Sequence, residues 1–208
     1  MRRGERRGNR EPGGVSVLPG TYKVRFTFGD QMDSTDIEVK YDPRINMSDA
    51  AIQAKYDALK GLESSYSLGV QAVDRLKESV KIAKGIQKDL KEKDKEGYEE
   101  QIKMTKTTID TLNTMLDVFL GKEDDRQGIT RSQPNSVGNF YSAAYRYTSN
   151  ALHAPGETEN KLIAKFEDEM AKAMEMVNGY YSAEWPKFRE AVENLDTSPF
   201  KDYEEIKE

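Results

Sequence analysis

The single histidine, His153, is the residue on which most catalytic chemistry in this sequence would have to depend. A di-iron carboxylate site needs a Glu-x-x-His pair on each of two helices, whereas the residue three positions before His153 is Asn150. Ser-His-Asp and Cys-His sets need the same histidine, and neither a nucleophile-elbow motif nor a glycine-rich phosphate loop precedes an expected helix. We therefore expect no catalytic residues, and we interpret His153 as an exposed or capping side chain beside the helix-breaking Pro155-Gly156.

Residue types that bind metals or cofactors are also sparse. The sequence contains no cysteine, which excludes disulfides, thiol catalysis and zinc sites built on cysteine. Glu123, Asp124 and Asp125 precede Gly128 as in a calcium loop, but the alternating acidic positions, the central glycine and the closing glutamate of such a loop are missing. We expect neither a metal nor a cofactor, and we interpret residues 122–135 as a solvated loop.

Three aromatic residues, Tyr141, Tyr145 and Trp185, could form a platform for a carbohydrate or a peptide. They belong to a larger aromatic group on two expected helices that are neighbours in the sequence. A spacing of four residues along a helix is also the spacing of core packing, and core packing is the interpretation we favour. A small helical enzyme or ligand-binding protein that uses these three residues is the alternative.

An alternating pattern before the helices predicts a β-hairpin within residues 15–43. Apolar residues of the first strand alternate with Lys23, Arg25 and Thr27, as they do in a half-buried strand. These apolar residues form what we call the apolar face: Tyr22, Val24, Phe26 and Phe28. Residues 29–33 are the expected hairpin loop, and residues 37–41 are the expected returning strand.

The apolar face is also the candidate interaction surface. An isolated two-stranded hairpin is marginal in water, and its edges invite pairing. We therefore expect Phe26 and Phe28 to be covered by the helices or by a second copy of the chain.

The rest of the sequence predicts long helices. Apolar residues recur at steps of three or four from Ile52 to Leu90, after an N-cap at Ser48. A second seam, with alternating steps of four and three, runs from Tyr98 to Phe119 and ends at Gly121. Two further helices follow, and Pro186 predicts a kink or a restart in the last one near residues 182–185.

Together these patterns predict a mostly α protein, an antiparallel bundle of three to four long helices preceded by a short β-hairpin. The expected organisation is a disordered basic tail at residues 1–14, the hairpin at 15–43, the helical bundle at 44–197 and a C-terminal tail at 198–208.

Charge and hydropathy narrow the classes of partner. The net charge is −5, yet five arginines and a single glutamate lie within the first ten residues. A nucleic-acid-binding arm normally acts with a basic face on the folded part, and the later sequence has no such face, so we expect no nucleic acid partner. No run of about 18 apolar residues exists, so we expect no membrane span, and the N-terminus lacks the apolar segment of a secretory signal.

Several stretches resemble a known family. LPGTYKVRFTFGD, IEVKYDPR and MSDAAIQAKYDALKGL, at residues 18–30, 37–44 and 47–62, are similar to the C-terminal region of bacterial sortilin-type β-propeller proteins, often labelled BNR-repeat glycosyl hydrolases. The later NFYSAAYRYTSNALHAPGETE and YYSAEWPKFREAVENL also resemble this region, although Gly156-Glu157-Thr158 replaces the Pro-Thr step of the family.

The resemblance implies that the hairpin closes an immunoglobulin-like β-sandwich and that a helical bundle comes last. It implies a non-catalytic structural or protein-interaction module at the C-terminal end of a larger periplasmic or secreted protein. The hydrolase label belongs to the propeller, which this chain does not contain, so no active site is carried over. The implied partners are the missing propeller and sandwich domains, or a second copy of the chain.

Overall fold

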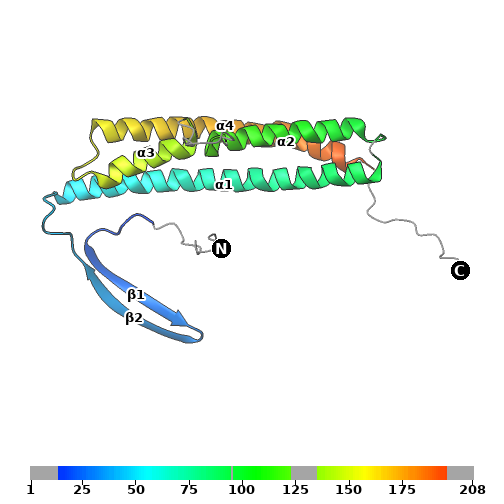
Figure 1. Cartoon of the computed structure of the whole chain (residues 1–208). Helices are drawn as coiled ribbons and strands as arrows, with labels where there is room; N and C mark the ends of the chain where they lie inside the picture. Colours follow the sequence, from blue (N-terminus) through cyan, green and yellow to red (C-terminus); the bar gives the residue numbers. More distant parts are fainter. Residues whose placement is uncertain (1–13, 95, 123–134, 196–208) are drawn as a thin grey trace, which may run out of the picture. The chain divides into compact units, whose positions relative to one another are not determined.

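The structure is a computed structural model that describes residues 14–94, 96–122 and 135–195. The described elements are two strands followed by four helices (Figure 1). Their bounds are β1 Gly20–Phe28, β2 Gln31–Val39, α1 Asp49–Lys93, α2 Glu99–Leu120, α3 Val137–Asn150 and α4 Glu157–Glu193. The predicted fold class, a mostly α chain with a hairpin before the helices, is confirmed. The predicted basic tail except Gly14, most of the loop at 122–135, and the tail at 198–208 lie outside the described residues.

Internal contacts divide the chain into two compact units. Unit 1 comprises Met1–Ser67 and Phe140–Glu167, and unit 2 comprises Leu68–Asn139 and Asp168–Glu208. Each of α1 and α4 therefore contributes its first part to unit 1 and its second part to unit 2.

The hairpin turns more tightly than the sequence pattern predicts. Phe28 pairs with Gln31, so the loop consists of Gly29 and Asp30 alone, and the predicted loop over residues 29–33 is wrong. Gly29 has a φ of 56°, which glycine adopts without strain and which two-residue hairpin turns require. The second strand consequently begins at Gln31 instead of at residue 37 and ends at Val39.

In unit 1, α3 packs between parts of α1 and α4 and runs opposite to α1 (Figure 1). The ring of Tyr141 on α3 stacks on Tyr66 of α1 at 3.9 Å and lies 5.5 Å from Phe166 of α4. Leu62 and Phe166 are fully buried. The core of this unit is therefore built where the apolar stripes of the three helices meet.

α1 begins at the predicted cap and continues unbroken through 45 residues. The Ser48 hydroxyl accepts a hydrogen bond from the Ala51 N–H, as an N-cap does. The predicted apolar stripe passes through Val70, but Val70 is 42% exposed and Gly69 is buried instead. The Cα of Gly69 leaves room for Met170 of α4, because a Cβ there would lie 2.6 Å from the Met170 methyl carbon.

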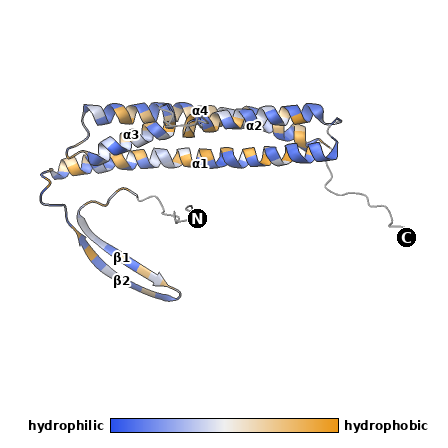
Figure 2. Cartoon of the chain, viewed as in Figure 1, coloured by the Kyte–Doolittle hydropathy of each residue, from blue (hydrophilic) through white to orange (hydrophobic). Residues whose placement is uncertain are grey.

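In unit 2, α2 runs opposite to the second part of α1 and packs on it and on α4 (Figure 1). Ala83, Ile109 and Phe188, one from each helix, form a shared core cluster. Four residues of the predicted seam on α2 are buried, namely Thr105, Ile109, Leu112 and Phe119. The predicted Leu116 is only half-buried, and Met115 is buried instead. Figure 2 shows apolar and polar residues interleaved along these helices, as expected for helices with one buried stripe each.

Two predicted helix features have different outcomes. Gly121 ends α2 with a φ of 85°, and its N–H donates to the Asp117 carbonyl at 2.8 Å, which confirms it as the C-cap. Pro186 does not restart α4, which continues to Glu193. Proline removes one helical hydrogen bond, while the packing of Trp185 and Phe188 beside it on the core cluster holds the helical backbone in place.

Candidate interaction surfaces

The apolar face of the hairpin is open to solvent at its distal end. Phe26 is 60% exposed and Phe28 is 87% exposed, so the described residues of this chain do not cover them. The expectation that the helices would cover these rings is therefore wrong, and covering by a second copy stays a prediction. Tyr22 and Val24 are half-buried, and the Tyr22 hydroxyl donates to the Leu18 carbonyl at 2.7 Å.

The strand register gives the two faces of the hairpin different chemistry. Directly opposed residues of an antiparallel pair lie on the same face, so Ile37, opposite Tyr22, extends the apolar face. On the other face Lys23 is opposite Asp36, a pair of complementary charges suited to water. On the apolar face Asp33 lies opposite Phe26 and Gln31 opposite Phe28, so the exposed apolar surface of this face comes mainly from β1. The other face is mostly polar, although it also carries the exposed Met32 opposite Thr27.

Both edges of the hairpin are unpaired, since the described sheet has only these two strands. Neither strand contains a proline, which would block pairing by removing a backbone N–H. Every second residue of each strand therefore directs its backbone N–H and C=O outward, where another strand can meet them.

The structure places the predicted ligand aromatics in separate clusters. Tyr141 and Tyr145 lie in unit 1 with ring centroids 5.7 Å apart, and burial raises the pKa of Tyr141. Trp185 lies in unit 2, with its ring 5.4 Å from Phe188 and 5.9 Å from Tyr181. All three rings are half-buried and pack on other rings. A ligand site that uses all three residues stays a prediction.

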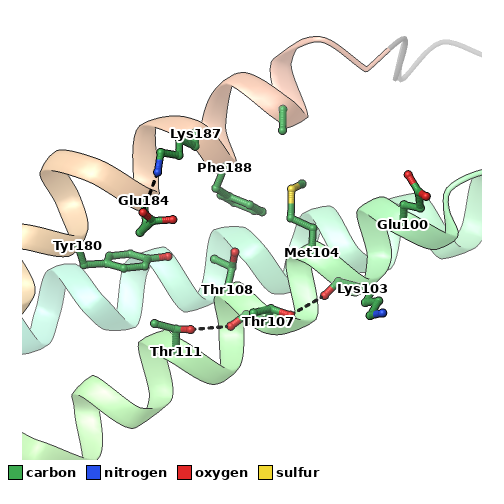
Figure 3. A pocket seen from close by; sticks show the side chains of 11 residues that line it. Glu100, Lys103, Met104, Thr107, Thr108, Thr111, Tyr180, Glu184, Lys187 and Phe188 are labelled. Carbon is green, nitrogen blue, oxygen red and sulfur yellow. Dashed lines mark hydrogen bonds and ion pairs between the residues drawn. The ribbon is translucent and has the colours of Figure 1, made fainter.

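Sequence reasoning missed a groove of about 710 Å³ between α2 and α4 in unit 2. Figure 3 shows Met104 of α2 and Phe188 of α4 directed into it. Its far end is formed by Thr111 and Tyr180. We call this the α2–α4 groove. The heptad pattern of α2 did not predict this groove, because the residues beside the apolar stripe have nearly the same composition as a solvent-exposed helix face.

The threonine and tyrosine hydroxyls of the α2–α4 groove are engaged within the protein. The hydroxyls of Thr107 and Thr111 donate to the carbonyls of Lys103 and Thr107, each four residues earlier on α2 (Figure 3). Burial raises the pKa of Tyr180, and a hydrogen bond with the Thr108 side chain acts against that shift. The groove therefore presents mainly methyl groups, rings and the Met104 thioether.

Within residues 14–94, 96–122 and 135–195, no three or more acidic, histidine or cysteine side chains form a group that could hold a metal ion. None of the helices described is both long and apolar enough to cross a membrane. His153 is exposed, and its ring Nδ1 lies 2.7 Å from the Ala154 carbonyl oxygen.

Comparison with known proteins leaves this chain without a match: neither a family model, nor a curated protein, nor a solved structure is similar enough to it.

Proposed function

We propose that this chain is a non-catalytic protein-interaction module whose hairpin completes a β-sheet contributed by another polypeptide segment. In this proposal the chain is the C-terminal part of a larger sortilin-like propeller protein that works in the periplasm or outside the cell. The exposure of Phe26 and Phe28 on the apolar face is the observation that carries the proposal.

The energetics favour a covered hairpin. Burying a phenylalanine side chain is worth about 1.5–3 kcal/mol relative to leaving it exposed. Much of this stabilisation is missing in the chain alone, because Phe26, Phe28 and the 45% exposed Ile37 remain open to solvent. A partner sheet with an apolar inner face would recover it, as facing sheets do in a β-sandwich.

Backbone pairing supplies the second part of the interaction. Strand addition at an open edge gives affinity through main-chain hydrogen bonds, and alternate side chains give specificity. Both hairpin edges are open in the described sheet, and a nine-residue strand offers several such bonds. The tight turn at Gly29 keeps the two strands in one register, so the apolar face is presented as a single surface.

The proposal is tested by comparing this chain with a longer polypeptide that also carries the reading frame preceding Met1. Amide hydrogen exchange is measured for β1 and β2 in both. We expect the outward-facing amides to exchange much more slowly in the longer polypeptide, because a third strand pairs with them.

Phe26→Asp and the matched opposite-face variant Thr27→Asp complete this test. Phe26→Asp is expected to abolish the added protection and Thr27→Asp to keep most of it. Equal exchange in the short and long polypeptides, or a preceding frame without strand patterns, would overturn the proposal. Protection that appears in the short chain only as its concentration rises would assign the sheet to a second copy instead.

A further inference from the structure

The two edges of the hairpin offer different backbone donors. Phe28 and Gln31 flank the turn, and the residues that flank a two-residue turn hydrogen-bond to each other. Because bonded and unbonded pairs alternate along an antiparallel ladder, every second residue of each strand points its N–H outward. On β1 these residues are Thr21, Lys23, Arg25 and Thr27, and on β2 they are Met32, Ser34, Asp36 and Glu38.

The β2 edge is partly blocked against another strand. The Ser34 N–H, one of its outward donors, already donates to the carboxylate of Asp33 at 2.8 Å. Asp33 lies on the apolar face, and an inward-pointing charge at an edge hinders pairing. Asp36 and Glu38 line the same edge, and Glu38 is paired with Lys40 at 3.0 Å. A strand joining β2 would have to break the Asp33 hydrogen bond and desolvate its carboxylate, which is costly.

The β1 edge has no such obstacle. In the described part of the chain, no side chain accepts a hydrogen bond from the outward N–H groups of β1. The exposed apolar surface also comes mainly from β1, since the same face of β2 carries Gln31 and Asp33. A strand beside β1 would therefore pair with free donors and cover the flanks of Phe26 and Phe28.

The charges of β1 indicate the chemistry of that strand. Lys23 and Arg25 are the charged residues of β1, and both are exposed on the polar face. Asp36 lies opposite Lys23, whereas the residue opposite Arg25 is the uncharged Ser34. Opposite charges on neighbouring strands stabilise a sheet, and like charges destabilise it. The β1 edge therefore favours a strand with a carboxylate beside Arg25.

We propose that β1, and not β2, is the edge at which another polypeptide segment joins the sheet, through a strand with a carboxylate beside Arg25 and apolar residues at the two flanking positions. The flanking residues lie beside Val24 and Phe26, because side chains alternate between the faces of a strand. This inference rests on the proposed function and adds the edge and the chemistry of the partner strand. Antiparallel pairing of two β1 strands about Val24 would place Lys23 of one copy beside Arg25 of the other, and these like charges disfavour a second copy.

Amide hydrogen exchange resolved by residue tests which edge is used. It is measured in this chain alone and in the longer polypeptide that includes the reading frame preceding Met1. We expect the outward amides of β1 to exchange about tenfold or more slowly in the longer polypeptide, and those of β2 to exchange equally in both. Protection of β2 instead, or of both edges equally, would overturn this inference and leave the proposed function standing. No protection on either edge would overturn both.

Two matched variants of the longer polypeptide test the charge. Arg25→Glu and Ser34→Glu introduce the same residue at opposed positions of the polar face, one on each edge. Both positions are exposed, so circular dichroism should show the helices of the parent in both variants. We expect Arg25→Glu to reduce the protection of β1 by about threefold or more and Ser34→Glu to keep it. Equal effects would overturn the assignment of a carboxylate beside Arg25.

A measurement on this chain alone tests the edge without the preceding frame. The probes are two strand peptides of alternating valine and threonine, one with a central glutamate and the other with a lysine in its place. In NMR spectra we expect the glutamate peptide to shift the outward amide signals of β1 at several-fold lower concentration than the lysine peptide, and less so at high salt. Shifts confined to β2, or no difference between the peptides, would overturn the inference. Shifts that depend on the concentration of the chain without a peptide would assign the edge to a second copy and overturn it too.

Discussion

At the scale of single residues, Lys55 shows a contact that sequence reasoning missed. Its ammonium group donates hydrogen bonds of 2.7 Å to the carbonyls of Ser149 and Ala151, at the C-terminal end of α3. The last carbonyls of a helix lack partners within it, and a cation there also suits the helix dipole. Desolvation lowers the pKa of Lys55, which is the cost of placing the charge in this half-buried position.

Lys55→Met should therefore destabilise the chain. The change leaves two carbonyls without their donor, and we expect a loss of roughly 1–3 kcal/mol in the free energy of unfolding. Urea unfolding followed by circular dichroism measures it. Lys60→Met is the control, since its exposed ion pair with Glu63 should be worth no more than about 1 kcal/mol. Equal losses in both variants would contradict the capping role.

Buried tyrosines make stability depend on alkaline pH. Burial raises the pKa of Tyr181, whose hydroxyl lies 2.8 Å from that of Ser79, and burial does the same for Tyr141 and Tyr180. A tyrosine whose pKa is raised on folding contributes its full stabilisation at every pH below the pKa of an unfolded tyrosine, which is about 10. This contribution is lost as the pH rises through the folded pKa.

Tyr181→Phe should lower stability at neutral pH and flatten its decline above about pH 10. The measurement is urea unfolding at a series of pH values in the variant and the parent chain, with tyrosinate absorbance recorded in parallel. Tyr147→Phe, at an exposed position, is the control and should leave the slope unchanged. A Tyr181→Phe profile parallel to that of the parent chain would count against the raised pKa.

At the scale of elements, the glycines of α1 differ in what surrounds them. A Cβ added at Gly61 or Gly85 would meet no atom within 4 Å, whereas one at Gly69 would collide with the flexible end of Met170. Glycine inside a helix costs about 0.5–1 kcal/mol relative to alanine. Of these three glycines, only Gly69 is explained by packing, because a side chain there would displace Met170.

Gly61→Ala and Gly85→Ala should each stabilise the chain by about 0.5–1 kcal/mol. Gly69→Ala should gain less, because Met170 must move, and Gly69→Leu should be destabilising through overpacking. Thermal and urea unfolding rank the four variants. If Gly69→Leu proves as stable as Gly61→Ala, the close approach of Met170 to α1 is wrong.

At the scale of the whole molecule, the chain combines helices that bury their own apolar stripes with a hairpin that does not. Leu76 and Leu112 are fully buried, whereas Phe28 is almost fully exposed. Helical stability comes mainly from packing an amphipathic face, and the helices obtain that packing within the chain. The hairpin has no comparable cover among the described residues.

Phe26→Asp should therefore leave the melting temperature of the chain alone unchanged, as followed by helical circular dichroism. The ring is already 60% exposed, so little buried area is lost. Thr27→Asp, on the charged face, should behave the same way. A lower melting temperature for Phe26→Asp alone, especially one that varies with protein concentration, would show that another copy covers the ring.

Local patterns determined most of the architecture of this protein. The steps of three and four predicted the helices, Ser48 and Gly121 predicted two of their ends, and alternation predicted the apolar face. These features are readable because they depend on residues within a few positions of each other. The same locality explains the error at Gly29, where a two-residue turn replaced a longer loop. It also explains why the helix continues past Pro186 without a restart, which was one of the two predicted outcomes there.

Tertiary structure decided the features that join residues far apart in the sequence. Lys55 caps a helix more than ninety residues later, Gly69 is buried by Met170, and the α2–α4 groove is formed by residues about eighty positions apart. Such contacts depend on which faces of the packed helices meet, and many pairings satisfy the same apolar stripe equally well. The sequence by itself therefore determined which residues are apolar enough to favour burial. The packing decided which of them are buried, and it left Phe26 and Phe28 at the distal end of the hairpin exposed.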